Sequence, residues 1–331
     1  MPDDRGRAAR SPWAIPSRGW KDILWRTWRS AGRNRLGTVA GGVTFYLLLA
    51  AFPALAAFVS VYGLFLDLGG VENRLHDLAR VFPHAVIDLV RGEMVRLATQ
   101  RHEALGAGVV GGALASAWSA NAGMKALFDG LNVAYGETEK RPYLRRGLIT
   151  YAATLGLLAL LVGVTALTTI AAPALPAPVR WLTIYVLAAG AFALVYRLGP
   201  SRTSPRWRWA ACGALVAALA WLVGSMGLSS YLHNFAHFGA TYGSLGAVIA
   251  LMLWLWFSVM VVLWGGVLNA EIEHQTGADT TVGPEAPIGE RGATMADTLG
   301  EAFTLSPRDA AAFLLRQPGH AQAWLRGLRR R

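Results

Sequence analysis

The stretch YGSLGAVIALMLWLWFSVMVVLWGGVLNAEIEH, residues 242–274, decides the fold. It holds no charged side chain before Glu271, which is followed by Glu273. A helix is one of only two backbone forms that satisfy their own hydrogen bonds in lipid, and about 20 apolar residues suffice to cross a bilayer. The stretch therefore predicts a membrane-spanning helix that ends in acidic residues.

The composition is that of a polytopic membrane protein. Of the 331 residues, 54% are hydrophobic and only 15% are charged, whereas a soluble domain has about 25% charged residues. The charges lie between long apolar runs, which argues against most classes of soluble enzyme. The single cysteine, Cys212, lies within an apolar run, so no disulfide can form within the chain.

Apolar runs of spanning length predict an all-α fold with a core of six transmembrane helices over residues 38–274. Pro53 should kink the first of these helices, because proline removes one backbone hydrogen bond. The predicted spans cover about residues 38–66, 104–126, 147–171, 180–198, 208–232 and 243–270.

The segments around these spans have their own patterns. Residues 1–37 are basic: 1–17 read as a disordered cytosolic tail, and 18–37 predict an amphipathic helix with tryptophans. Such a helix lies in the headgroup plane or packs as an ordinary cytosolic helix, since both have this pattern. Acids and bases alternate over 67–103, which predicts two amphipathic extracytoplasmic helices. Residues 275–331 predict a cytosolic linker and a basic helical tail.

Lysine and arginine predict the orientation of the chain. They gather in residues 1–37, 125–146 and 197–208 and after residue 270, whereas the connections between these segments are neutral or balanced. By the positive-inside rule, the N- and C-termini should both lie in the cytosol. The rule also accounts for the net charge of +11, so we expect anionic membrane lipids as partners and no nucleic acid.

Motifs for catalysis or for a bound cofactor are weak. Gly106, Gly108 and Gly111 match a dinucleotide fingerprint, but no strand precedes them, so close helix packing explains them better. His233 and His237 lie four residues apart without a third metal ligand nearby. We therefore expect no enzyme, no metal site and no cofactor.

Polar residues recur along one face at the end of the second predicted span. Asn121, Lys125, Asp129 and Asn132 share this face, and Asn269, Glu271 and Glu273 close the sixth span. Ionisable groups facing lipid are costly, so both sets should face protein or water. We expect Lys125 to pair with Asp129, Glu271 or Glu273 beside a cytosol-facing cavity. The alternative is a polar network that only fixes helix packing.

Six stretches, in order between about residues 20 and 274, resemble the YihY/BrkB family of bacterial inner-membrane proteins, also known as UPF0761. The matching stretches are GGVTFYLLLAAFPALAAFVSVYGL (41–64), WSANAGMKALFDGLNVAYGETEKR (118–141), YRLGPSR (196–202), RWRWAACGALVAALAW (206–221), NFAHFGATYGSLGAVIALMLWLW (234–256) and GGVLNAEIEH (265–274).

The resemblance implies six transmembrane helices in the plasma membrane. It also suggests functional or fold-defining roles for matched residues, whereas Asp129 lies where the family is expected to vary. The matched residues are Phe45, Tyr46, Pro53, Trp118, Asn121, Lys125, Asn132, Tyr135, Tyr242, Gly243, Gly246, Asn269 and Glu271.

Members of this family have been labelled tRNA-processing ribonucleases and have been linked to serum resistance and envelope lipid export. No catalytic constellation here supports the ribonuclease label, which is the weakest reading. We expect a transporter or flippase, not driven by ATP, that moves an amphiphile such as an anionic envelope lipid. The alternative is a membrane scaffold that recruits envelope-biogenesis partners. A homo-oligomer is compatible with either.

Overall fold

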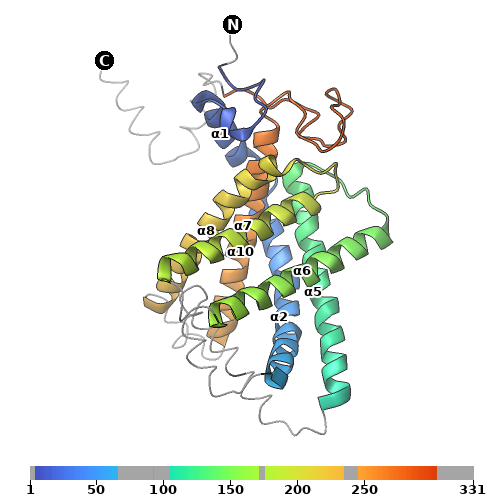
Figure 1. The fold of residues 1–331 in the computed structure, drawn as a ribbon, viewed down its shortest axis with the longest axis vertical. Helices are drawn as coiled ribbons and strands as arrows, with labels where there is room; N and C mark the ends of the chain where they lie inside the picture. Colours follow the sequence, from blue (N-terminus) through green and yellow to red (C-terminus); the bar gives the residue numbers. More distant parts are fainter. Residues whose placement is uncertain (1–3, 66–91, 93–104, 171–175, 235–244, 304–331) are drawn as a thin grey trace, which may run out of the picture.

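The computed structural model describes residues 4–65, 92, 105–170, 176–234 and 245–303 (Figure 1). Over these residues the chain forms seven α-helices and a short 3₁₀ turn, with no strand beyond one isolated bridge between Pro205 and Thr281. The predicted all-α class is thus confirmed. The elements are η1 (Pro12–Ala14), α1 (Ser17–Arg33), α2 (Leu36–Phe65), α5 (Leu105–Tyr135), α6 (Tyr143–Ile170), α7 (Ala177–Leu198), α8 (Trp207–Asn234) and α10 (Leu245–Glu273).

Several helices are built to cross a membrane. Among the described residues, Pro178–Leu198, Trp207–Leu232 and Val248–Glu273 are long and apolar enough to do so, with mean hydropathies of 1.6, 1.9 and 2.3. They lie in α7, α8 and α10, at three of the predicted spans. Helices α2, α5 and α6 coincide with the other three predicted ranges. The protein is therefore an all-helical, multi-pass membrane protein.

Helix α10 lies at the centre of the bundle and contacts α1, α2, α5 and α8 (Figure 1). Helix α2 packs along α5, and α7 along α8. Small residues allow the closest of these approaches, as is usual between helices in lipid. A side chain on Gly213 of α8 would lie only 2.5 Å from the carbonyl oxygen of Gly265 on α10.

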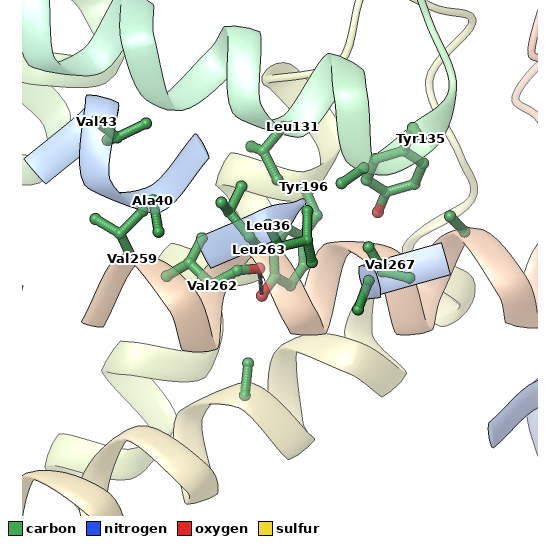
Figure 2. Packing of buried hydrophobic residues seen from close by; sticks show 14 of the residues in the cluster. Leu36, Ala40, Val43, Leu131, Tyr135, Tyr196, Val259, Val262, Leu263 and Val267 are labelled. Atoms are coloured by element: carbon green, nitrogen blue, oxygen red, sulfur yellow. Dashed lines mark hydrogen bonds between the residues drawn. The ribbon is translucent and has the colours of Figure 1, made fainter. Parts of the chain in front are cut away.

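The apolar core forms where α2, α5, α7 and α10 meet. Figure 2 shows Leu36 and Val43 of α2 and Leu131 of α5 packed around Leu263 of α10. Tyr196 of α7 is fully buried in this cluster, and its hydroxyl donates a 2.8 Å hydrogen bond to the carbonyl oxygen of Val262. This bond satisfies the one polar atom that the tyrosine brings into the core.

Helix α5 is longer than predicted. The expected span ended near residue 126, but the helix continues to Tyr135. It stops because Gly136 adopts a left-handed conformation with a φ of 64°. The amide of Glu137 then donates to the carbonyl oxygen of Asn132 at 2.8 Å, as in a Schellman motif. The extension therefore carries two of the four residues of the polar face of α5, Asp129 and Asn132.

Four polar segments gather at one end of the bundle, which we call the polar end: residues 4–35, 136–142, 199–206 and 274–303 (Figure 1). The sequence predicted one membrane side for all four. Two details of the prediction were wrong. Residues 4–17 are not a disordered tail, because Ile15 is buried and the carbonyl oxygen of Ala9 accepts a 2.7 Å bond from the hydroxyl of Thr276.

Residues 277–289, the second wrong detail, are not a loose linker. Arg291 is buried beneath this segment, and its guanidinium donates to the carbonyl oxygens of Gly277, Ala286 and Ala296 at 2.8–3.0 Å. One arginine thus orders a loop that has no helix of its own. The amphipathic helices expected over 67–103 and the tail over 304–331 lie outside the described residues, apart from Gly92.

Helix α1 combines features of both predicted alternatives. Ile23, Thr27 and Ala31 face the protein, as in an ordinary packed helix. Leu24 and Trp28 are exposed instead. The face that packs against α10 is also strongly polar, which the simple apolar pattern of the sequence did not indicate.

Candidate functional site

The first acidic residue at the end of α10 is enclosed by α1. Glu271 accepts a 2.7 Å hydrogen bond from Nε of Arg26 and another of 2.7 Å from the hydroxyl of Ser30. The same arginine donates to the side-chain oxygen of Gln275 at 2.7 Å. Glu271 and Arg26 are both buried, so this ion pair fastens α1 to the end of α10.

The second acidic residue has a different arginine partner. Arg202, from the connection between α7 and α8, donates to both carboxylate oxygens of Glu273 at 2.7 and 2.8 Å. The hydroxyl of Thr280 adds a third bond of 3.1 Å. The guanidinium carbon of Arg202 lies 4.4 Å from the ring centre of Tyr135. Two parallel bonds of this kind fix geometry as well as charge.

Asn269 holds α8 against α10. Its side-chain oxygen accepts a 2.7 Å bond from the amide of Gly213, and its nitrogen donates to the carbonyl oxygen of Ala210 at 2.9 Å. Asn269 is fully buried. Because both ends of the amide are matched by backbone groups of the neighbouring helix, this residue acts as a cross-link between helices.

Asn132 makes a similar cross-link, between the end of α5 and the connection from α7 to α8. Its side-chain oxygen accepts a 2.7 Å bond from the amide of Ser201, and its nitrogen donates to Glu139 at 3.3 Å. Partial burial alone would raise the pKa of Glu139, but hydrogen bonds from Arg141 outweigh it and hold that pKa below the usual value. Asn132 therefore belongs to the same matched network at the polar end.

The remaining polar residues of α5 are arranged differently. Asp129 forms an exposed ion pair with Arg146, at 2.7 Å. The ammonium of Lys125 lies 5.5 Å from the ring centre of Tyr143, and no carboxylate in the described part of the chain pairs with it. The expected pairing of Lys125 is therefore wrong, because arginines from other elements already hold all three candidate carboxylates.

Asn121 stands apart from every other amide of this set. Asn121 is 2% exposed, and among the described residues its side-chain oxygen has no hydrogen-bond partner. It lies one helical turn before Lys125 on α5. Helix α5 thus places an unmatched acceptor and an unmatched cation next to each other.

The fold-defining candidates fall into several environments. Tyr135 is buried in the apolar core, and Gly246 of α10 is buried. Phe45, Tyr46 and Trp118 are exposed, with the rings of Phe45 and Tyr46 in edge contact at 5.5 Å. Pro53 lies within α2. Tyr242 and Gly243 are outside the described residues.

Besides Glu139, two further carboxylates of the polar end, Asp279 and Asp297, have pKa values below the usual range. Burial alone would raise the pKa of Asp279, but hydrogen bonds from backbone amides, chiefly that of Thr281, lower it further than burial raises it. The same balance lowers the pKa of Asp297, which accepts hydrogen bonds from the amide of Arg291 and its neighbours. Both residues therefore stabilise the 277–297 segment as anions.

Comparison with known proteins gives the family. The model of the family named virulence factor BrkB matches residues 27–289. The chain belongs to this family. The ribonuclease-like protein YfkH of Bacillus subtilis is 28% identical to it over 266 residues, which cover 76% of this chain and 93% of that protein.

Other relatives of this BrkB-family chain are longer. A UPF0761 membrane protein of Ralstonia nicotianae is 28% identical over 262 residues, or 74% of this chain, and one of Nitrosospira multiformis is 28% identical over 249 residues, or 71%. In both cases the match spans 57% of the relative. No solved structure matches the chain.

Sequence reasoning missed the arginines of this BrkB-family network. Arg26 was counted only among the basic residues of the amphipathic helix predicted over 18–37, and Arg202 was noted only as part of YRLGPSR. A signal was available: each is an arginine in a segment predicted to share a membrane side with the acidic end of α10. The described residues include no group of three or more His, Cys, Asp or Glu side chains placed to hold a metal ion.

Proposed function

We propose that this protein moves an anionic amphiphile, of the envelope-lipid class, across the bacterial inner membrane without ATP. In this proposal six helices span the membrane, and the polar end with both termini faces the cytosol. Basic segments at the polar end support that orientation, because lysine and arginine accumulate on the cytosolic side.

One observation supports transport above the alternatives: the unmatched pair on α5. A polar group at membrane depth is costly unless it has a partner. Asn121 nevertheless keeps an unpartnered oxygen there, and Lys125 has only an aromatic ring beside it. A headgroup with a phosphate and a hydroxyl or ammonium group would satisfy both, since the phosphate pairs with the lysine and the donor with the amide oxygen.

The scaffold hypothesis remains the second candidate, for a specific reason. Val282, Ile288 and Leu299 are exposed on the ordered loops of the polar end, where a partner protein could bind. Replacing Val282, Ile288 and Leu299 together by serine tests it and leaves Arg291 unchanged. A scaffold that binds its partner through these residues should lose function, whereas a transporter should keep it.

Lipid translocation in liposomes tests the transport proposal. Fluorescent phospholipids and a membrane-impermeant quencher would report exchange between leaflets for the wild type, Lys125→Ala and Arg145→Ala. Arg145 is the matched control, because it is an exposed cation on α6 near the same end. We expect exchange that falls about tenfold in Lys125→Ala, equivalent to about 1.4 kcal/mol, and is unchanged in Arg145→Ala.

Two results would count against this proposal. Folded wild-type protein that exchanges neither anionic nor zwitterionic lipids would exclude lipid transport. Equal loss in Lys125→Ala and Arg145→Ala would show that net charge, and not the α5 pair, determines the rate.

A further inference from the structure

The apolar stretch Leu36–Ala50 begins at the start of α2, so the span proposed for this helix enters the membrane there. Leu36 begins this helix and is buried in the same cluster as Leu263 of α10 (Figure 2). Nε1 of Trp256 donates a 3.1 Å bond to the carbonyl oxygen of Gly37, one residue further on. The last two turns of α10, with Glu271, therefore extend beyond the start of α2 into the polar end. The turn between α1 and α2 lies at headgroup level.

An apolar pocket opens at this level between α1, α2 and α10. It has a volume of about 220 Å³ and is lined by Trp28, Ala31, Gly32, Leu36, Gly37, Met260 and Trp264. No charged side chain lines it. The rings of Trp28 and Trp264 meet at 5.7 Å between centres, and Trp28 is 74% exposed. Tryptophan favours the membrane interface, where one side of the ring is wet and the other apolar.

Positive charge surrounds the pocket. The exposed charged residues of α1 and the turn after it are all basic: Arg18, Lys21, Arg29, Arg33 and Arg35. The one acidic residue of α1, Asp22, is buried and paired with Arg5. Exposed carboxylates pair with two of these cations: Asp4 with Arg18, and Glu301 with Arg29 at 3.4 Å.

Arg33 and Arg35 are the cations closest in sequence to the pocket-lining residues Gly32 and Leu36. Arg33 donates to the hydroxyl of Ser30 at 3.0 Å and has no carboxylate partner among the described residues. Arg35 has a left-handed backbone with a φ of 47°, a conformation that costs energy for a residue with a side chain. Both arginines are therefore sequence neighbours of residues that line the pocket, Gly32 and Leu36.

We propose that this pocket binds an anionic phospholipid of the polar-end leaflet, with its phosphate on Arg33 and Arg35 and an apolar segment of the lipid packed against Trp28 and Trp264. The proposal deepens and rests on the proposed function, since it names where the lipid is first held before it reaches Lys125. A pocket of this volume is too small for a helix of a second protein, which has a diameter of about 10 Å with its side chains. A lipid provides both the negative charge and the narrow apolar segment.

Native mass spectrometry of the full chain from nanodiscs with equal parts phosphatidylglycerol and phosphatidylcholine provides the test. Gly32→Leu adds an apolar side chain at the pocket, and a Cβ at Gly32 meets no atom within 4 Å. Gly156→Leu is the matched control: that glycine also has open space around its Cβ but lies on α6. Arg33→Gln and Arg35→Gln remove the charge and keep an unbranched polar side chain.

We expect the wild type to retain phosphatidylglycerol over phosphatidylcholine, with a preference that falls about fivefold for each arginine replaced. Gly32→Leu should lose the retained lipid, and Gly156→Leu should behave as the wild type. Equal retention of the two lipids by the wild type would overturn the proposal. So would unchanged retention in Gly32→Leu, which would indicate that the lipid binds elsewhere.

The same variants in the translocation assay separate this proposal from the proposed function. Retention that depends on the pocket, in a protein that exchanges no lipid, would keep the lipid site and exclude transport. Normal exchange with retention that is indifferent to Gly32→Leu, Arg33→Gln and Arg35→Gln would keep transport and exclude this site.

Discussion

Four polar side chains near the polar end differ from Asn121, in the middle of α5, in whether protein groups occupy their hydrogen bonds. At the polar end, Glu271, Glu273, Asn269 and Asn132 all have protein partners at 2.7–3.3 Å. On α5, the oxygen of Asn121 has none. Matched groups hold helices in place, and they leave no capacity for a ligand. A polar residue near the end of a span is therefore a candidate for a functional site only when other protein groups do not already occupy its hydrogen bonds.

The largest expected effect comes from breaking one buried ion pair. Arg202→Ala leaves the carboxylate of Glu273 buried without its bidentate partner, which should destabilise the protein by about 3–5 kcal/mol. The double variant Arg202→Met with Glu273→Met should recover much of this loss, since no uncompensated charge is left. Thermal unfolding in detergent measures both.

The matched control for that pair is the exposed ion pair of α5. Asp129→Ala breaks the contact with Arg146 in a solvated setting and should cost about 1 kcal/mol or less. If Asp129→Ala destabilised the protein as much as Arg202→Ala does, burial would not be what distinguishes the two pairs.

Paired asparagine variants sharpen the comparison at a smaller scale. Asn269→Leu leaves partner groups on α8 unmatched and should cost about 1–3 kcal/mol in stability. Asn121→Leu replaces the unpartnered amide by an apolar side chain with the same branching. Stability should therefore stay the same or rise while lipid exchange falls. Unfolding and exchange, measured on both variants, separate a structural amide from a functional one. A stability loss in Asn121→Leu equal to that of Asn269→Leu would place both in the structural class.

The smallest effect is local and depends on pH. The folded pKa values of Asp279 and Asp297 are depressed, so their contribution is fully present above the unfolded value of about 3.9. It is lost as pH falls from there through the lower folded values. Protection factors for amide hydrogen exchange over 277–297, which are corrected for the intrinsic pH dependence of exchange, should therefore fall below about pH 4 and stay constant near neutrality. Asp279→Asn should weaken this pH dependence, and no change in that variant would contradict the assignment.

The helix positions could be predicted because crossing lipid is a local property of the sequence. The predicted span at 180–198 corresponds to Ala177–Leu198, and the one at 243–270 to Leu245–Glu273. Apolar composition over about 20 residues is sufficient for that. The end of α5 was missed, since the polar residues after Met124 look like a loop until their partners on other segments are known.

The site was harder to predict than the fold because its contacts join residues that lie far apart in the sequence. Asn121 and Lys125 were singled out correctly as polar residues of α5, but spacing along a helix gives no information about partners on other helices. Arg26 bonds to a residue 245 positions away, and Arg202 to one 71 positions away. The periodicity of a single sequence gives no information about contacts between residues so far apart in the chain.

The bond between Arg26 and Glu271 has a consequence for how the molecule is made. Arg26 leaves the ribosome before any of the described spanning helices, and its carboxylate partner comes after all of them. Until α10 has been made, Arg26 has no carboxylate partner at the end of that helix, and α1 cannot dock there. Docking of α1 therefore depends on the completion of α10, and a chain that stops short of this helix should leave the Arg26 guanidinium without its carboxylate.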